Sequence, residues 1–211
     1  TAVPENERIV VIEDSSELKL AQKHSLYLEA QQADSYGRGG VTIRDLFRAS
    51  LRMRPDRIIV GEVRGGEALD MVQSMISGHT GSLTTVHATS PRDALVRLET
   101  LSLMSDVDIP VYVARAQVAS AVNVIVQLSR FADDGSRKVT RVAEAFGLGA
   151  NNEYQFHDIF KSQMRGRSES GELISELEFT GQQPTFASEP YEHGLEGDIN
   201  HTLPLWENSD T

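Results

Sequence analysis

The sequence contains no cysteine, and no apolar run approaches the ~18 consecutive residues that a membrane-spanning helix requires. The absence of cysteine excludes a disulfide scaffold and a thiolate metal site, and it is typical of a reducing cytoplasm. The first residues show no signal-peptide pattern. Any association with a membrane is therefore expected to depend on a partner protein.

Clustered positive charge is also missing. The net charge is −11, and residues 151–211 contain 12 acidic but only 3 basic residues, whereas residues 1–150 are nearly neutral. Binding of nucleic acid needs a basic surface, so we expect no nucleic-acid partner. The length and the charge distribution predict one globular domain over residues 1–162 and an acidic, poorly ordered tail over residues 163–211.

Short apolar runs alternate with helical patterns along the first 130 residues. Strands are predicted over Arg8–Ile12, Arg57–Val60, Ser82–Val86 and Val122–Leu128. Helices are predicted over Thr42–Met53, Glu67–Ile76, Pro91–Met104 and Val113–Ala121. This alternation favours the α/β class, with a mostly parallel sheet flanked by helices. The first, second and fourth runs are nearly continuous in Val and Ile, which is typical of strands buried on both faces.

The second half of the chain contains a strong turn signal. Asp133-Asp134-Gly135-Ser136 lies between two strand-like segments and predicts a C-terminal β-hairpin. A last strand is predicted over Tyr154–Phe160. The composition of Glu172–Phe179 is also compatible with a strand.

Charged and titratable side chains follow three of the predicted strands. They are Glu13, Asp14 and Glu17 after the first strand, Glu62 and Arg64 after the second, and His87 after the third. Ligands of open α/β sheets bind beyond the carboxyl ends of the strands, so we expect these side chains to meet at one edge.

Each of these residues also has an ordinary structural explanation. A glutamate after a strand commonly supports the N-terminus of the next helix. Gly65-Gly66 can be a simple turn, and a single histidine at a strand end is usually a hydrogen-bonded loop residue. The occurrence of all these features on three strand ends favours a functional site.

A four-residue apolar strand followed by an acid is the Walker B arrangement of nucleotide-hydrolysing folds. Its carboxylate, here Glu62, can hold Mg²⁺ through water or polarise an attacking water, and Mg²⁺ needs only one or two carboxylates besides waters and phosphate oxygens. Arg64 and Arg97 can stabilise charge on a transferred phosphoryl group, and His87 can sense the γ-phosphate. The pattern predicts phosphoryl transfer to water.

Three segments resemble the motifs of the type II/type IV secretion ATPase superfamily. Ile12–Leu18 (IEDSSEL) is similar to its Asp box, Arg54–Met75 to its Walker B region, and Gly78–Glu99 to its His box. The similarity continues through Ala119–Glu144 and His157–Phe160 (HDIF), and it is strongest to the CpaF-type ATPases of Flp (tight-adherence) pilus assembly. Three long motifs in the right order make the resemblance specific.

The resemblance implies a RecA-like P-loop NTPase domain that binds ATP and Mg²⁺. It further implies a cytoplasmic hexamer, peripheral on the inner membrane through a platform protein, that hydrolyses ATP to power pilus assembly or protein secretion.

The resemblance also implies roles for individual residues. Glu62 corresponds to the catalytic Walker B glutamate, Glu13, Asp14 and Glu17 to the Asp-box acids, His87 to the His-box histidine, and Arg97 to an arginine that links the nucleotide site to its neighbour. Asp14 and Arg64 are expected to contact the nucleotide, and Glu62 and Asp14 to hold Mg²⁺ through water. The division of roles among the three Asp-box acids stays open.

The phosphate-binding motif G-x-x-x-x-G-K-[ST] is absent. Gly37-Arg38-Gly39-Gly40 has no Lys-Ser/Thr and is interpreted as a flexible loop. Because the amides and lysine of a phosphate loop supply most of the grip on phosphate, the chain alone is expected to be inactive. This absence, and Thr1 in place of an initial methionine, lead us to expect a RecA-like domain that is incomplete at its N-terminal side.

Three functional hypotheses remain. The first is part of an ATPase, and the second is a non-catalytic pseudo-ATPase subunit that docks on the secretion or pilus machinery. The third, another RecA-like motor such as a helicase, is disfavoured by the nearly neutral body and the His-box pattern. The retained acids, His87 and Arg97 favour the first, since a subunit freed from catalysis has no chemical reason to keep them all.

Overall fold

A computed structural model of the protein describes residues 3–168, 171–192 and 194. The chain forms two compact units that divide between Val122 and Asn123. None of the helices in the described part of the chain is long and apolar enough to cross a membrane.

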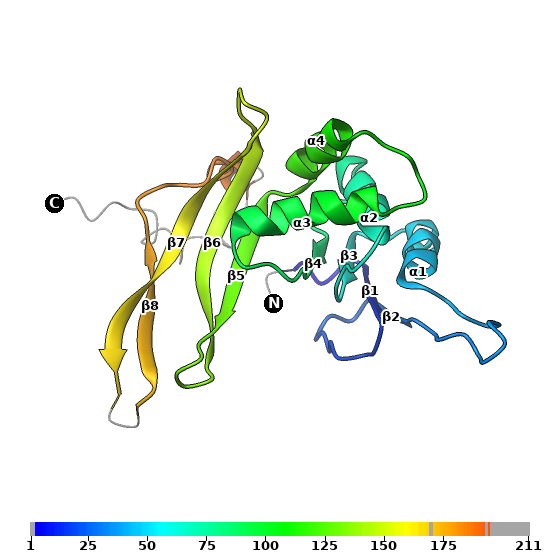
Figure 1. Ribbon diagram of the computed structural model, residues 1–211, viewed down its shortest axis with the longest axis horizontal. Coiled ribbons are helices and arrows are strands. Elements are labelled where there is room, and N and C mark those ends of the chain that lie inside the picture. The colour runs from blue at the N-terminus through cyan, green and yellow to red at the C-terminus, as the bar shows by residue number, and fades with distance from the viewer. Residues whose placement is uncertain (1–2, 169–170, 193, 195–211) are drawn as a thin grey trace. The chain divides into compact units, whose positions relative to one another are not determined.

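The first unit contains a four-stranded parallel sheet with the strand order β2-β1-β3-β4 (Figure 1). Its strands are β1 (Ile9–Glu13), β2 (Ser25–Glu29), β3 (Arg57–Val60) and β4 (Leu83–Thr84). All five residues of β1 are buried, as the continuous Val and Ile run predicts for a strand covered on both faces. Each fully buried Val or Ile side chain contributes about 1.5–3 kcal/mol, which makes β1 the centre of this core.

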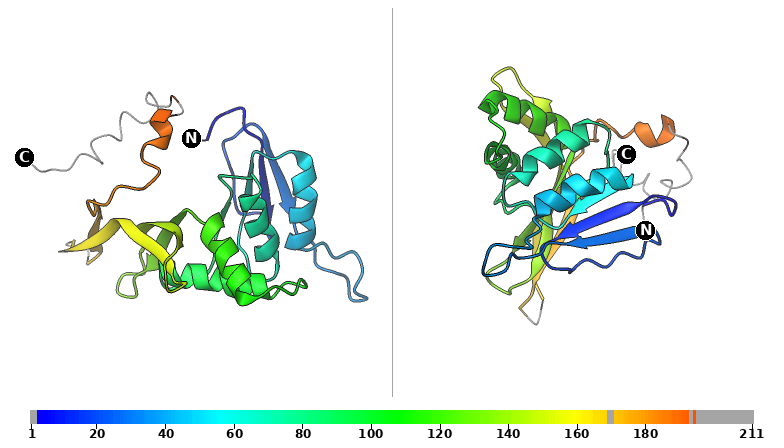
Figure 2. Two further views of the ribbon diagram at one scale, coloured as in Figure 1. Left: turned by 90° about the horizontal axis from the view of Figure 1, so that it is seen from above. Right: turned by 90° about the vertical axis from the view of Figure 1, so that its right-hand side faces the viewer.

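Four helices accompany this sheet and lie together on one side of it (Figures 1 and 2). They are α1 (Ile43–Ser50), α2 (Glu67–Ile76), α3 (Pro91–Leu103) and α4 (Val111–Ala121). α1 packs against β1 and β2, and α2 packs against the other three helices.

The predicted start signals of two helices are confirmed. Thr42 caps α1 in a capping box with Asp45, and Ser90 caps α3 with Pro91 in its first turn. Such caps satisfy backbone N–H groups that the helix itself leaves unpaired, which explains why both boundaries were readable from local sequence.

Two strands of this sheet differ from the prediction. β2 was not predicted: its five residues are all exposed or half-buried, and it is held at the sheet edge by parallel pairing with β1. The third predicted strand is shorter than expected, because only Leu83 and Thr84 pair with β3.

The second unit is a four-stranded antiparallel sheet with the order β5-β6-β7-β8. Its strands are β5 (Val124–Arg130), β6 (Arg137–Leu148), β7 (Tyr154–Arg167) and β8 (Leu173–Phe179), and a short helix α5 (Glu189–Glu192) follows. The predicted hairpin turn joins β5 to β6, with Gly135 at a φ of 72°.

The prediction for the fourth strand was wrong in one respect. β5 does not belong to the parallel sheet but pairs antiparallel with β6, and its residues alternate between exposed and half-buried. A run rich in Val and Ile therefore did not signal burial on both faces here, because β5 is an edge strand of an antiparallel sheet whose residues stay exposed or half-buried.

The ordered part of the second unit reaches beyond the predicted domain end. The boundary predicted at residue 162 falls within β7, and β8 pairs with β7 inside the segment assigned to the tail. Residues 195–211 of that tail lie outside the described residues.

Candidate active site

The carboxyl ends of β1 and β3 lie side by side, because the two strands are parallel neighbours with Ile12 opposite Val60. β1 therefore delivers Glu13 and Asp14 to the same sheet edge at which Glu62 follows β3. β4 pairs with β3 on its other side and leads into His87. The predicted convergence at one edge is confirmed for three of the strand ends.

Four side chains at this edge form the carboxyl-edge cluster: Asp14, Glu62, Arg64 and His87. The Arg64 guanidinium donates a hydrogen bond to Oε1 of Glu62, and its Nη1 atom lies 3.6 Å from Oδ2 of Asp14. The Nε2 atom of His87 lies 3.7 Å from Oε2 of Glu62. Arg64 thus bridges the acids that follow two neighbouring strands.

The cluster holds Glu62 in its charged form. The hydrogen bond from Arg64 lowers the pKa of Glu62 below its ordinary value, and the charges of Arg64 and His87 act in the same direction. The same hydrogen bond raises the pKa of Arg64. Near neutral pH Glu62 is therefore a carboxylate that can accept hydrogen bonds from water.

Glu62 also has an unused acceptor. Its Oε2 atom is buried, and no hydrogen-bond partner for it exists within the described residues. Buried carboxylate oxygens are rarely left without a donor or a cation, so Oε2 is an acceptor that a water molecule or a hydrated ion can occupy.

Mg²⁺ fits this donor set only in its hydrated form. No group of three or more metal-ligating side chains lies together in the described part of the chain. Glu62 and Asp14 offer two carboxylates with free oxygen atoms, which matches the one or two carboxylates plus waters and phosphate oxygens that Mg²⁺ takes in nucleotide sites.

Glu13 lies in a different environment from Glu62. It is buried, and its carboxylate accepts hydrogen bonds from the backbone N–H groups of Glu17 at 3.3 Å and Leu18 at 3.2 Å. A Cβ atom on Gly61 would lie 3.0 Å from Cγ of Glu13, so the glycine makes room for this side chain. In this geometry Glu13 orders the turn after β1, and the side chain of Glu17 is exposed.

Arg97 is not brought into the cluster. It lies in the middle of α3 with an exposed side chain, and no hydrogen bond or ion pair joins it to another side chain among the residues that the structure describes. Its guanidinium therefore takes no part in the cluster.

Two residues that shape the cluster were missed by sequence reasoning. The Glu67 carboxylate accepts hydrogen bonds from the backbone N–H groups of Arg64 at 2.7 Å and Gly65 at 2.8 Å. The Thr85 hydroxyl donates to the carbonyl of Gly61 at 2.6 Å. An acid in the first helical turn directly after Gly-Gly was the available signal for Glu67, whereas no local signal pointed to Thr85.

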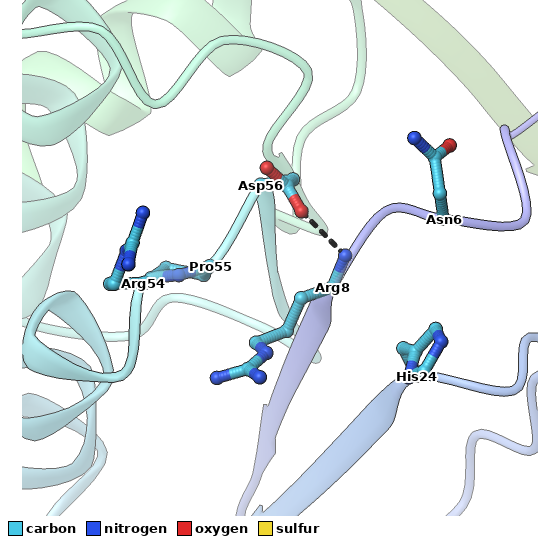
Figure 3. Close-up of a pocket in the computed structure, with 6 residues that line it drawn as sticks. All are labelled: Asn6, Arg8, His24, Arg54, Pro55 and Asp56. Carbon is cyan, nitrogen blue, oxygen red and sulfur yellow. Dashed lines mark hydrogen bonds between the residues drawn. The ribbon is translucent and has the colours of Figure 1, made fainter.

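A pocket of about 460 Å³ lies at the opposite edge of the same sheet, among residues that precede β1, β2 and β3 (Figure 3). We call it the amino-edge pocket, and it is lined by Asn6, Arg8, His24, Arg54, Pro55 and Asp56. The carboxyl-edge cluster does not line it. Size alone would favour this pocket, but the orphaned carboxylate oxygen and the paired charges favour the cluster as the reactive site.

The sequence profile of the type II/IV secretion system protein family matches residues 1–181. The chain belongs to this family. The family assignment agrees with the predicted resemblance and with the α/β class seen in the structure.

Individual secretion proteins show the same relationship. A protein of Mycobacterium tuberculosis named for conjugal transfer is 41% identical over 142 residues, which cover 67% of this chain and 40% of that protein. The type IV secretion system protein PtlH of Bordetella pertussis is 42% identical over 142 residues, covering 64% of this chain and 41% of PtlH. The chain thus spans about 40% of the length of these relatives.

A solved structure supports the fold. The VirB11 ATPase of the Brucella suis type IV secretion system, crystallised in complex with sulphate, aligns with a TM-score of 0.58 at 32% identity. The alignment covers 66% of this chain and 40% of that protein.

Proposed function

We propose that this chain supplies the water-activating half of an ATP-hydrolysing secretion motor. The observation that carries the proposal is the carboxyl-edge cluster, in which Arg64 orients one oxygen of Glu62 and leaves the other without a donor. Membership of the secretion family and similarity to a VirB11 ATPase support the same conclusion.

The proposed role of Glu62 is to accept a hydrogen bond from the attacking water through Oε2. Because Arg64 lowers the pKa of Glu62, the carboxylate is a weak base that suits orientation of the water better than early removal of its proton. Bound ATP with Mg²⁺ would supply the phosphoryl group and a neutralising charge, with Glu62 and Asp14 holding the ion through water.

The other residues are assigned supporting roles. His87 lies beside Glu62 with its side chain exposed, a position from which it can report on a γ-phosphate. Arg97 is proposed to reach a nucleotide site on a neighbouring subunit, since it is exposed and makes no contact with the cluster. Glu13 is proposed to order the turn that presents Asp14, and Glu17 to act from the same turn.

The phosphate grip must come from outside this chain, because the sequence contains no G-x-x-x-x-G-K-[ST] motif. We accordingly propose that the chain by itself has negligible ATP turnover and that the complete gene product is the active ATPase. This absence is also what favours the second candidate, a non-catalytic subunit that docks on the machinery. The two differ in whether the complete gene product turns over ATP at all.

The motor is proposed to act as a cytoplasmic hexamer, peripheral on the inner membrane through a platform protein. We propose Flp pilus assembly by a CpaF-type ATPase as its specific task, on the basis of the Asp-box, Walker B and His-box segments. The names of the relatives compared above come from type IV secretion and conjugal transfer, so protein secretion is the competing task.

Complementation of a deletion strain tests the task. The intact gene is expected to restore surface pili, and the Glu62→Gln variant is expected to express normally without restoring them. The matched control is Glu29→Gln, at the carboxyl end of β2 on the same sheet edge. Restoration of secretion or conjugation without pili would transfer the proposal to a type IV secretion system, and restoration of pili by Glu62→Gln would contradict it.

A further inference from the structure

The amino-edge pocket carries an excess of positive charge. Arg8 and Arg54 bring two guanidinium groups and His24 an imidazole, whereas Asp56 is the single carboxylate among its lining residues (Figure 3). One oxygen of Asp56 already accepts the backbone N–H of Arg8 at 2.6 Å. The pocket therefore suits a ligand with negative charge.

An adjoining hollow of about 250 Å³ extends the same charged surface. It shares Arg8 and His24 with the amino-edge pocket and adds Lys23, whose ammonium lies 3.2 Å from Glu5 in an exposed ion pair. Exposed pairs of this kind are weak, so Lys23 can exchange its partner at little cost. The first pocket alone lies within the range of roughly 300–1,000 Å³ that small-molecule sites occupy.

The backbone of Arg54 is unusual. Its φ of 53° and ψ of 56° lie in the left-handed region, where glycine or asparagine fits with less strain than a long side chain. No hydrogen bond or ion pair engages the Arg54 guanidinium within the described residues. Neither turn geometry nor an internal contact therefore explains why arginine stands here.

The helix end next to the pocket explains Arg8 but not Arg54. The carbonyls at a helix C-terminus favour cations, and Nη1 of Arg8 donates to the carbonyl of Met53 at 2.8 Å. Arg54 follows the same helical segment, Leu51–Met53, without donating to it.

We propose that the amino-edge pocket binds a phosphate group, with Arg54 as its principal contact. The planar guanidinium matches two phosphate oxygens at once, which a single ammonium cannot do. The phosphate group belongs either to a small phosphorylated molecule or to an anionic lipid headgroup. Because the pocket lies at the sheet edge opposite the carboxyl-edge cluster, this site is separate from the proposed ATPase chemistry.

The test uses the whole chain and two probes at low ionic strength. Calorimetric titration with inorganic pyrophosphate measures binding of a soluble phosphate, and sedimentation with phosphatidylglycerol–phosphatidylcholine vesicles measures binding of a headgroup. Arg54→Gln is expected to weaken binding at least about tenfold in one of the two assays, as expected when a charge-assisted hydrogen-bonding partner is lost. Arg52→Gln removes the same charge from an exposed position two residues away and is expected to change binding less than about twofold.

Arg54→Gly separates loss of the contact from loss of the fold. Glycine relieves the left-handed strain, so this variant is expected to have an unchanged or higher Tm and still to lose binding. Arg54-dependent binding of pyrophosphate alone assigns a small molecule, and Arg54-dependent binding of vesicles alone assigns a lipid headgroup. Absence of binding in both assays, or equal losses in Arg52→Gln and Arg54→Gln, would overturn the proposal.

Discussion

Arg64 donates a hydrogen bond to Oε1 of Glu62, while Oε2 of the same carboxylate has no hydrogen-bond partner among the described residues. One side of the carboxylate is thus fixed by the protein and the other is left for a water or ion. In the proposed chemistry, Arg64 orients the carboxylate through Oε1, and Oε2 accepts a hydrogen bond from the attacking water.

Removing Arg64 should change the titration of Glu62. Arg64→Gln is expected to raise the pKa of Glu62 toward its ordinary value, because the hydrogen bond and charge that lower it are gone. Carboxyl carbon NMR of the selectively labelled chain measures this directly. Arg52→Gln, which removes an exposed arginine elsewhere, should leave the Glu62 titration unchanged, and an equal shift in both variants would contradict the role of the hydrogen bond.

Two glycines around the cluster should tolerate alanine to different degrees. A Cβ on Gly66 would lie 2.6 Å from the backbone Cα of Ser105, whereas a Cβ on Gly61 would lie 3.0 Å from the side chain of Glu13. Backbone can move less than a side chain, so Gly66→Ala should lower the free energy of unfolding by roughly 3 kcal/mol and Gly61→Ala by roughly 1–2 kcal/mol. Urea unfolding measures the free energy of unfolding of both variants. A larger loss in Gly61→Ala than in Gly66→Ala would contradict this prediction.

The ion pair between α3 and α4, in which Glu99 is buried and Arg115 is half-buried, should be sensitive to loss of one partner. Glu99 is buried and accepts two hydrogen bonds from Arg115, at 2.9 and 3.0 Å. Arg115→Met would leave a buried carboxylate without this partner and is expected to cost about 3–5 kcal/mol in urea unfolding. Lys23→Met, which breaks an exposed pair with Glu5, should cost less than about 1 kcal/mol.

Acid should weaken the second unit through Asp134. Hydrogen bonds from the backbone N–H of Leu173 and from the hydroxyl and N–H of Ser136 lower the pKa of Asp134 from 3.8 to about 2. Because the folded pKa lies below the unfolded one, this stabilisation is complete above about pH 4 and is lost as the pH falls toward 2. Asp134→Asn should flatten the fall of the urea midpoint between these pH values, while Asp133→Asn should retain it.

Local signals predicted the helices and the strand ends well. The helix starts could be predicted from Thr42, Ser90 and Pro91, because capping interactions involve residues within one turn. The meeting of Glu62 and Asp14 could be predicted because parallel neighbours end at one edge, and only the strand order had to be assumed.

The pairing of strands that are distant in the sequence could not be predicted from local sequence patterns. β2 and β5 were missed or misplaced because their partners, β1 and β6, are chosen by tertiary contacts and not by their own composition. The difference between Glu13, which binds backbone amides, and Asp14, which meets Arg64, likewise depends on the path of the turn after β1.

Release of phosphate from Mg²⁺-ATP by the complete gene product tests the central claim most directly. Glu62→Gln is expected to lower kcat by about 10²–10³-fold and to leave the Kd for nucleotide within about threefold, because the lost interaction acts on the transition state. Glu29→Gln should keep kcat within about twofold of the natural protein. Unchanged turnover in Glu62→Gln would contradict the proposed site.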